Sequence, residues 1–76
     1  MTVNEKLYRL VQFASDMYIE YKVPTLPPPM PTGAEVVDMI MKKSKVDKLD
    51  IDVQAYKKLV KRADKKLLTL KDTTKI

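Results

Sequence analysis

The stretch VPTLPPPMPTG, residues 23–33, holds all five prolines and the single glycine of a 76-residue chain. Proline fixes its φ angle and has no N–H group to donate, so this stretch can be neither a helix interior nor a central β-strand. Residues 23–31 in polyproline II conformation at ~3.1 Å each would span about 28 Å, the length of about nineteen helical residues at ~1.5 Å each. We therefore predict a polyproline strap that runs back along a preceding helix, so that the next helix lies parallel to it.

The segment before the strap, residues 3–22, has the apolar periodicity of an amphipathic helix. Thr2 followed by Glu5 has the spacing of a capping box at its start. Its predicted buried stripe consists of apolar residues three or four positions apart, with two neighbours that widen it: Val3, Leu7, Leu10, Ala14, Met17 and Tyr21, with Val11 and Tyr18.

A second, weaker line on the same helix contains Tyr8, Gln12, Ser15 and Ile19. Aromatic rings pack well against pyrrolidine rings while a tyrosine hydroxyl stays in water. We expect the strap to cover this line. The residues predicted to make the contact are Pro24, Pro27, Pro28, Pro29 and Pro31 from the strap and Tyr8, Tyr18 and Tyr21 from the helix.

Two further helices are predicted after the strap. Thr32 and Glu35 have capping-box spacing at the start of the first. Asp52 is the predicted N-cap of the second, with Asp50 as the alternative. The heptad positions of this last helix, with one residue inside the same arc, are Val53, Tyr56, Val60, Ala63, Leu67 and Leu70, with Leu59.

The predicted fold class is therefore all-α, a small three-helix domain with a polyproline strap between helix 1 and helix 2. Its parts are helix 1 (3–22), the strap (23–31), helix 2 (33–44), a connector (45–52) and helix 3 (53–70), within one domain (1–71) that precedes a disordered tail (72–76).

The composition argues against enzymatic and metal-dependent chemistry. The chain has no Cys and no His, so it lacks disulfides, thiolate zinc sites and the commonest general base. A single glycine cannot form a glycine-rich phosphate loop. We expect a protein that is not an enzyme and has no catalytic residues, cofactor, metal or small-molecule substrate.

The expected location follows from two further features. The first residues, MTVNEKLYRL, lack the apolar core of a secretory signal. No run of the chain approaches the ~20 apolar residues of a membrane span. We expect a soluble, cytoplasmic protein that does not bind membranes.

The net charge of +5 lies entirely in residues 32–76, which carry twelve Lys and Arg against seven Asp and Glu. Six cations occupy roughly the half of helix 3 opposite its apolar stripe, and they are the predicted site for a partner or for phosphates: Lys57, Lys58, Lys61, Arg62, Lys65 and Lys66. A lysine stripe of this kind is also the ordinary solvated face of a soluble helix.

A positive face attracts acidic protein surfaces and nucleic-acid phosphates alike. Five of the six cations are lysine, whereas the reading of base edges favours arginine. We expect a small interaction protein that binds and regulates or assembles a macromolecular partner. A protein with an acidic surface is favoured, and nucleic acid bound largely without sequence specificity is the alternative.

Two other binding modes remain open. The short second helix leaves part of the apolar seams of its neighbours uncovered, which favours a homodimer or another protein partner unless the strap and connector cover them. The pairs PTLP and PPMP within the strap have the PxxP spacing of ligands for aromatic grooves. We rank this ligand role below the structural one.

Overall fold

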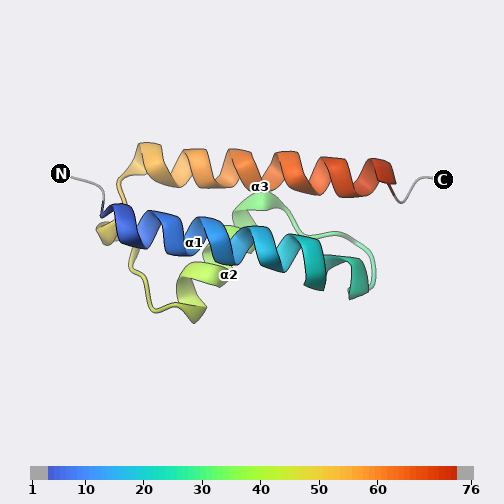
Figure 1. The fold of residues 1–76 in the computed structure, drawn as a ribbon, viewed down its shortest axis with the longest axis horizontal. Helices are drawn as coiled ribbons and strands as arrows, with labels where there is room; N and C mark the ends of the chain where they lie inside the picture. The colour runs from blue at the N-terminus through green and yellow to red at the C-terminus, as the bar shows by residue number, and fades with distance from the viewer. Residues whose placement is uncertain (1–3, 74–76) are drawn as a thin grey trace.

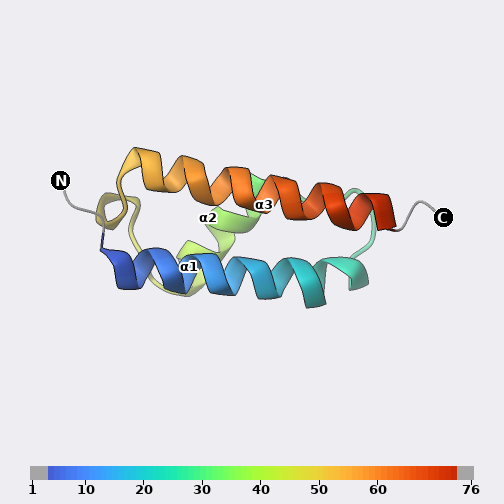
Figure 2. The same ribbon diagram turned by 45° about the horizontal axis from the view of Figure 1, so that its top comes forward.

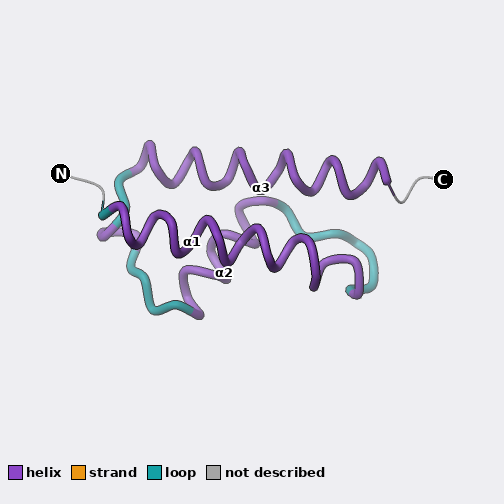
Figure 3. The backbone as a smooth tube through the Cα atoms, in the orientation of Figure 1, coloured by secondary structure: helices purple, strands orange, loops and turns teal. Residues whose placement is uncertain are grey.

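The computed structural model describes residues 4–73, and within this range every regular element is a helix (Figure 1; Figure 3). The elements in chain order are α1 (Glu5–Met17), a π-helical turn (Tyr18–Lys22), a 3₁₀ turn (Val23–Thr25), α2 (Gly33–Lys43), a second 3₁₀ turn (Lys48–Asp50) and α3 (Val53–Thr73). The prediction of a small all-α fold with three main helices is confirmed. The predicted tail overlaps the last residues of α3, and residues 74–76 lie outside the described range.

The predicted N-caps of α2 and α3 are confirmed, and the N-cap of α1 is a different residue from the predicted one. The Asp52 carboxylate accepts from the Ala55 N–H at 2.7 Å at the start of α3, and the Thr32 hydroxyl accepts from the Glu35 N–H at 3.2 Å at the start of α2. Thr2, the predicted cap of α1, lies outside the described residues. There the Asn4 side chain accepts from two N–H groups of the first turn, as short polar residues commonly do.

The first helical segment runs further than expected. It passes from α1 through the π-helical turn into the 3₁₀ turn and ends at Thr25. Pro24 lies in the first turn of the 3₁₀ segment, where proline is tolerated because its missing N–H would have no helical partner. The prediction that a polyproline conformation begins at residue 23 is therefore wrong, and the segment without regular secondary structure is limited to residues 26–32, with bends at 26, 28 and 29.

α1 and α3 run parallel and in register. Arg62 pairs with Asp16, and one turn later Lys66 pairs with Glu20. The two pairs are separated by the same number of positions along the chain, 46, which requires both helices to point the same way. Figures 1 and 2 show the two long helices side by side, with their N-terminal ends together.

α2 runs antiparallel to both long helices, which corrects the predicted parallel arrangement of helices 1 and 2. Its first residue, Gly33, meets Asp64 in the middle of α3, whereas Asp38, further along α2, meets Tyr56 near the start of α3. The segment of residues 26–32 reaches only part of the way back along α1, because it is shorter than the predicted strap. α2 itself completes the return, crossing beneath the long helices in Figure 1.

The core is formed by one line of α1, most of α2 and one line of α3, with support from the connecting segments. Its buried apolar residues are Val11, Ile19, Val23, Val36, Val37, Ile40, Met41, Val46, Ile51, Ala55, Leu59, Ala63 and Leu67. Ser15 is buried among them. Ser15 and Ile19, from the line that the sequence ranks second, therefore face the core together with Val11 from the first stripe.

The stripe of α1 that the sequence ranks first is divided: Val11 is buried and Leu7, Ala14 and Tyr18 pack against the core, whereas three other members do not. Leu10, Met17 and Tyr21 are exposed, so the prediction that they are buried is wrong. Val53 of α3, also assigned to the core, is exposed as well.

The proline segment packs differently from the prediction. Pro24, Pro27 and Pro28 line a shallow groove that also includes Leu70 of α3. Pro31 shares a groove with Tyr18, so these two residues of the predicted contact lie together.

The surroundings of the other two predicted tyrosines give no support for a proline contact. Tyr21 is 67% exposed. Tyr8 lies near the start of α3, where it lines a groove with Asp52 and Ala55. Pro29 is exposed.

The single glycine is required by close approach. The Gly33 N–H donates to the Asp64 carboxylate of α3 at 2.8 Å. A Cβ at this position would collide with that carboxylate and lie 2.7 Å from the Val60 carbonyl oxygen. Any side chain would therefore push the start of α2 away from α3.

Candidate functional site

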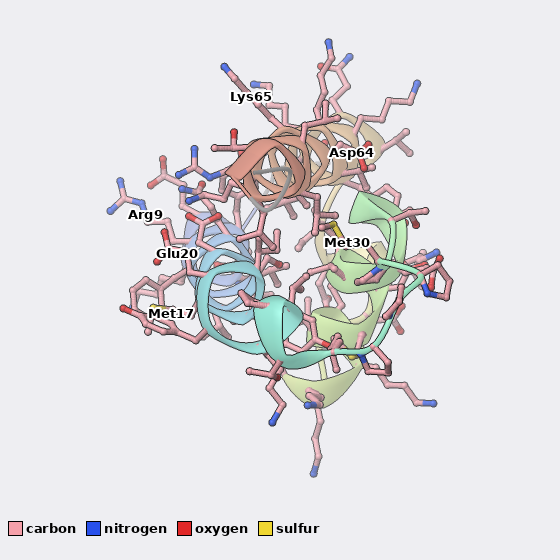
Figure 4. The ribbon with its side chains drawn as sticks, turned by 90° about the vertical axis from the view of Figure 1, so that its right-hand side faces the viewer. Arg9, Met17, Glu20, Met30, Asp64 and Lys65 are labelled. Carbon is pink, nitrogen blue, oxygen red and sulfur yellow. The ribbon has the colours of Figure 1, made fainter. Side chains whose placement is uncertain are left out.

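The six predicted cations of α3 divide into two groups. Arg62 and Lys66 point toward α1 and are held in ion pairs. The other four make no ion pair with the described residues, and all are exposed: Lys57, Lys58, Lys61 and Lys65. In Figure 4, Lys65 points away from the bundle. The predicted lysine face is thus narrower than the sequence indicates.

The paired cations connect α1 to α3. The Nε atom of Arg62 lies 3.2 Å from each oxygen of the Asp16 carboxylate, and Nη2 lies 3.0 Å from one of them. This fork of hydrogen bonds, reinforced by the carboxylate charge, raises the pKa of Arg62 above its ordinary value. Because Arg62 is the only arginine among the six, its engagement leaves a face made of lysine alone.

A shallow groove between α2 and α3 adjoins this lysine face. Apolar surface of Ala34, Tyr56 and Val60 lines the groove, together with charged residues that border it: Lys57, Lys58, Lys61 and Asp64. Asp64 is already engaged with the Gly33 N–H. The groove therefore combines an apolar floor with several cations that have no internal partner.

Tyr56 is fixed at one end of the groove. Its hydroxyl donates to Asp38 of α2 at 2.7 Å. This hydrogen bond, with smaller effects of desolvation and of the Asp38 charge, raises the pKa of Tyr56 to about 12. The Lys48 ammonium lies 5.1 Å from the centre of the Tyr56 ring and 3.6 Å from the Asp38 carboxylate. The hydroxyl and one face of the Tyr56 ring are therefore both in contact with charged groups.

The sequence pattern predicts the lysines but misses the groove. The groove depends on the close contact of α2 with α3 at Gly33 and on the small side chain of Ala34 next to it. A Gly-Ala pair at a helix start is a usable signal for such contact. Its meaning becomes clear only once Asp64 is known to lie opposite.

The outer face of α1 and of the π-helical turn that continues it carries a second exposed surface, which we call the α1 apolar stripe. Its members, with their exposed fractions, are Leu10 (46%), Phe13 (66%), Met17 (40%) and Tyr21 (67%). Figure 4 shows Met17 directed away from the other two helices. The stripe and the lysine groove occupy different helices and different sides of the molecule.

The described range, residues 4–73, holds neither a metal cluster nor a membrane-spanning helix. No three acidic, His or Cys side chains in this range gather closely enough to hold a metal ion. None of the helices described there is long and apolar enough to cross a membrane.

Comparison with known proteins gives no assignment. The chain matches no protein family, no curated protein and no solved structure.

Proposed function

We propose that this chain is a non-enzymatic interaction protein that binds an acidic segment of another protein in the groove between α2 and α3, and thereby regulates or assembles that partner. The observation that carries the proposal is the apolar floor of Ala34, Tyr56 and Val60 bordered by exposed lysines. An acidic amphipathic helix or strand is complementary to this combination.

In this proposal the lysines at the border of the groove and its apolar floor contribute to binding in different ways. Exposed lysines attract acidic partners and accelerate association, although each contributes little to final affinity in water. Burial of the apolar floor supplies affinity at about 25 cal/mol per Å² of apolar area removed from water. Tyr56 suits the role of an anchor at the end of the groove because its hydroxyl is bonded to Asp38 and Lys48 lies over its ring, so little side-chain freedom is lost on binding.

Nucleic acid is the second candidate, and one observation ranks it lower. Arg62 forms a forked pair with Asp16, so the four cations of the face that make no ion pair with the described residues include no arginine for bidentate contacts with bases or phosphates. The remaining lysines would give phosphate contacts with little sequence preference.

The test uses a fluorescent helical peptide with Leu on one face, at spacings of three and four residues, and Glu on the opposite face. We expect binding that weakens with salt, and a loss of at least about tenfold in affinity in the double variant Lys57→Glu/Lys61→Glu. The matched control is Lys42→Glu/Lys43→Glu, which makes the same change of net charge on exposed residues at the end of α2.

Equal losses in the two double variants would mean that only net charge matters, and would contradict a site in the groove. Mixed-sequence duplex DNA serves as the competing ligand. Binding to DNA that is tighter than binding to the peptide, with a log-log salt slope of several units, would favour the nucleic-acid alternative.

For the proline segment we propose an internal structural role, as a strap that closes the end of the bundle. Val23 is buried, and Met30 packs against the core. Replacement of Pro27, Pro28 and Pro29 by Ser should lower the melting temperature because the unfolded chain gains freedom. An unchanged melting temperature would instead favour a role as an exposed ligand segment.

A further inference from the structure

The α1 apolar stripe has a charge pattern along its edge that is complementary to itself. Lys6, Phe13 and Glu20 are seven positions apart. Lys6 and Phe13 lie in α1, where a heptad drifts by only ~20°, and Glu20 lies in the π-helical turn that continues α1. Figure 4 shows Glu20 on the same side of the bundle as Met17. Lys6 and Glu20 are exposed at the two ends of this set, and Phe13 lies at its middle. The charges are thus opposite in sign about Phe13.

A two-fold axis through Phe13 brings opposite charges together. In an antiparallel pair of α1 helices, Lys6 of each copy would face Glu20 of the other, and Leu10 would face Met17. A parallel pair would place Lys6 against Lys6 and Glu20 against Glu20, which is repulsive. Closed two-fold contacts require this kind of self-complementary surface.

We propose that the α1 apolar stripe is a homodimer interface in which two copies of the chain pack their α1 helices antiparallel, with the two Phe13 rings at the two-fold axis. Glu20 can serve this contact because its side chain is 53% exposed while it pairs with Lys66 at 3.3 Å. One carboxylate can accept from two ammonium groups.

The size of the stripe sets the strength of the dimer. Leu10 and Tyr21 are eleven positions apart, which is about 16 Å at ~1.5 Å per residue. One helix pair of this length buries less than the ~800 Å² per partner of a standard interface. The dimer is therefore a reversible one that dissociates on dilution.

This interface is independent of the lysine groove, since it uses the outer face of α1. Phe13→Glu should abolish the dimer and leave binding of the acidic peptide unchanged. Loss of peptide binding with an intact dimer would overturn only the proposed function, and absence of a dimer with intact peptide binding would overturn only this inference.

The absence of cysteine from the chain makes disulfide trapping a direct test. Disulfides form only where Cα atoms come within ~7 Å. Phe13→Cys should crosslink to itself under mild oxidation because residue 13 lies on the two-fold axis. Met17→Cys should not, since its two copies would be offset by about 12 Å along the helix at ~1.5 Å per residue.

Mixed samples and a control complete the test. A mixture of Leu10→Cys and Met17→Cys should crosslink between the two variants in preference to either alone. Leu68→Cys, on the exposed side of α3, measures random collision. Equal crosslinking at positions 13, 17 and 68 would overturn the antiparallel dimer.

Sedimentation of the unmodified chain provides a second measurement that does not depend on a variant. We expect a mass that rises from monomer toward dimer with concentration, and a dissociation constant at least tenfold weaker for Lys6→Glu. A strict monomer at millimolar concentration would overturn the inference and would mean that the stripe is solvated or is covered by a different protein.

Discussion

The outer faces of α1 and α3 differ although the two helices lie parallel and are joined by two ion pairs. α3 turns lysines outward and buries a single apolar line. α1 has two apolar lines, buries the one that contains Val11 and Ile19, and leaves the one that contains Phe13 and Met17 exposed. Helical periodicity alone therefore orients a helix only when one of its faces is clearly polar.

The largest expected effect separates the two lines of α1. Ile19→Ala should lower the free energy of unfolding by about 3 kcal/mol, because Ile19 is 1% exposed and a cavity would remain. Phe13→Ala should change it by less than about 0.5 kcal/mol in dilute solution. Urea denaturation at micromolar concentration measures both. A larger loss at Phe13 than at Ile19 would reverse the assignment of the lines.

Ser15 sharpens the comparison because it is a polar residue on the buried line. Its hydroxyl is buried and has no hydrogen-bond partner among the described residues. Ser15→Ala should raise the free energy of unfolding by about 1 kcal/mol, since an unsatisfied buried hydroxyl is costly. Ser44→Ala, at a half-exposed position, is the control and should have little effect. A loss of stability in Ser15→Ala would show that the hydroxyl makes a favourable contact.

The ion pair between Asp16 and Arg62 tests the register of the parallel helices. A double-mutant cycle with Asp16→Asn and Arg62→Gln should give a coupling of about 0.5–1 kcal/mol, limited by the half-exposed guanidinium. The same cycle on Asp16 and Lys61 should give no coupling energy, because the Lys61 side chain faces away from α1. Coupling of equal size in both cycles would contradict the register.

The last prediction concerns the hydrogen bond between Tyr56 of α3 and Asp38 of α2. The pKa of Tyr56 is raised to about 12 by its hydrogen bond to Asp38, whereas an unfolded chain has a tyrosine pKa of about 10. A raised pKa stabilises the fold fully below the unfolded value, and this contribution is lost as pH rises from about 10 to 12. Tyr56→Phe should therefore cost about 0.5–1 kcal/mol at pH 7.

The pH dependence distinguishes this hydrogen bond from packing. The difference between Tyr56→Phe and the unmodified chain in urea denaturation should shrink from pH 9 upward. Tyr21→Phe, with its exposed ring, should show no difference at any pH. A difference for Tyr56→Phe that stays constant to pH 12 would contradict the raised pKa of Tyr56.

The sequence predicted those parts of the fold that depend on neighbouring residues. Helical periodicity gave the three main helices, and Thr32 and Asp52 were recognised as caps from their spacing. The predicted heptad positions of α3 are largely correct, because the six cations occupy one side of the helix and leave only the opposite side to be buried. Lys57 and Lys61 were likewise recognised as exposed cations, although their role in binding stays a prediction.

The parts that failed depend on contacts between distant residues. The two apolar lines of α1 compete on hydrophobicity alone, and pairing of Asp16 with Arg62 turns the charged edge of α1 toward α3. The direction of α2 depends on the Gly33 contact with Asp64, and no local pattern encodes that distance. The groove was missed for the same reason.

The central claim, that α1 buries its Val11 and Ile19 line and exposes its Leu10 and Met17 line, can be measured on methyl groups. A soluble gadolinium chelate broadens the NMR signals of exposed methyls, and the Phe13→Glu variant keeps the chain monomeric. The account predicts strong broadening at Leu10 and Met17 with protection at Val11 and Ile19. Protection of Leu10 and Met17 together with broadening of Ile19 would contradict it.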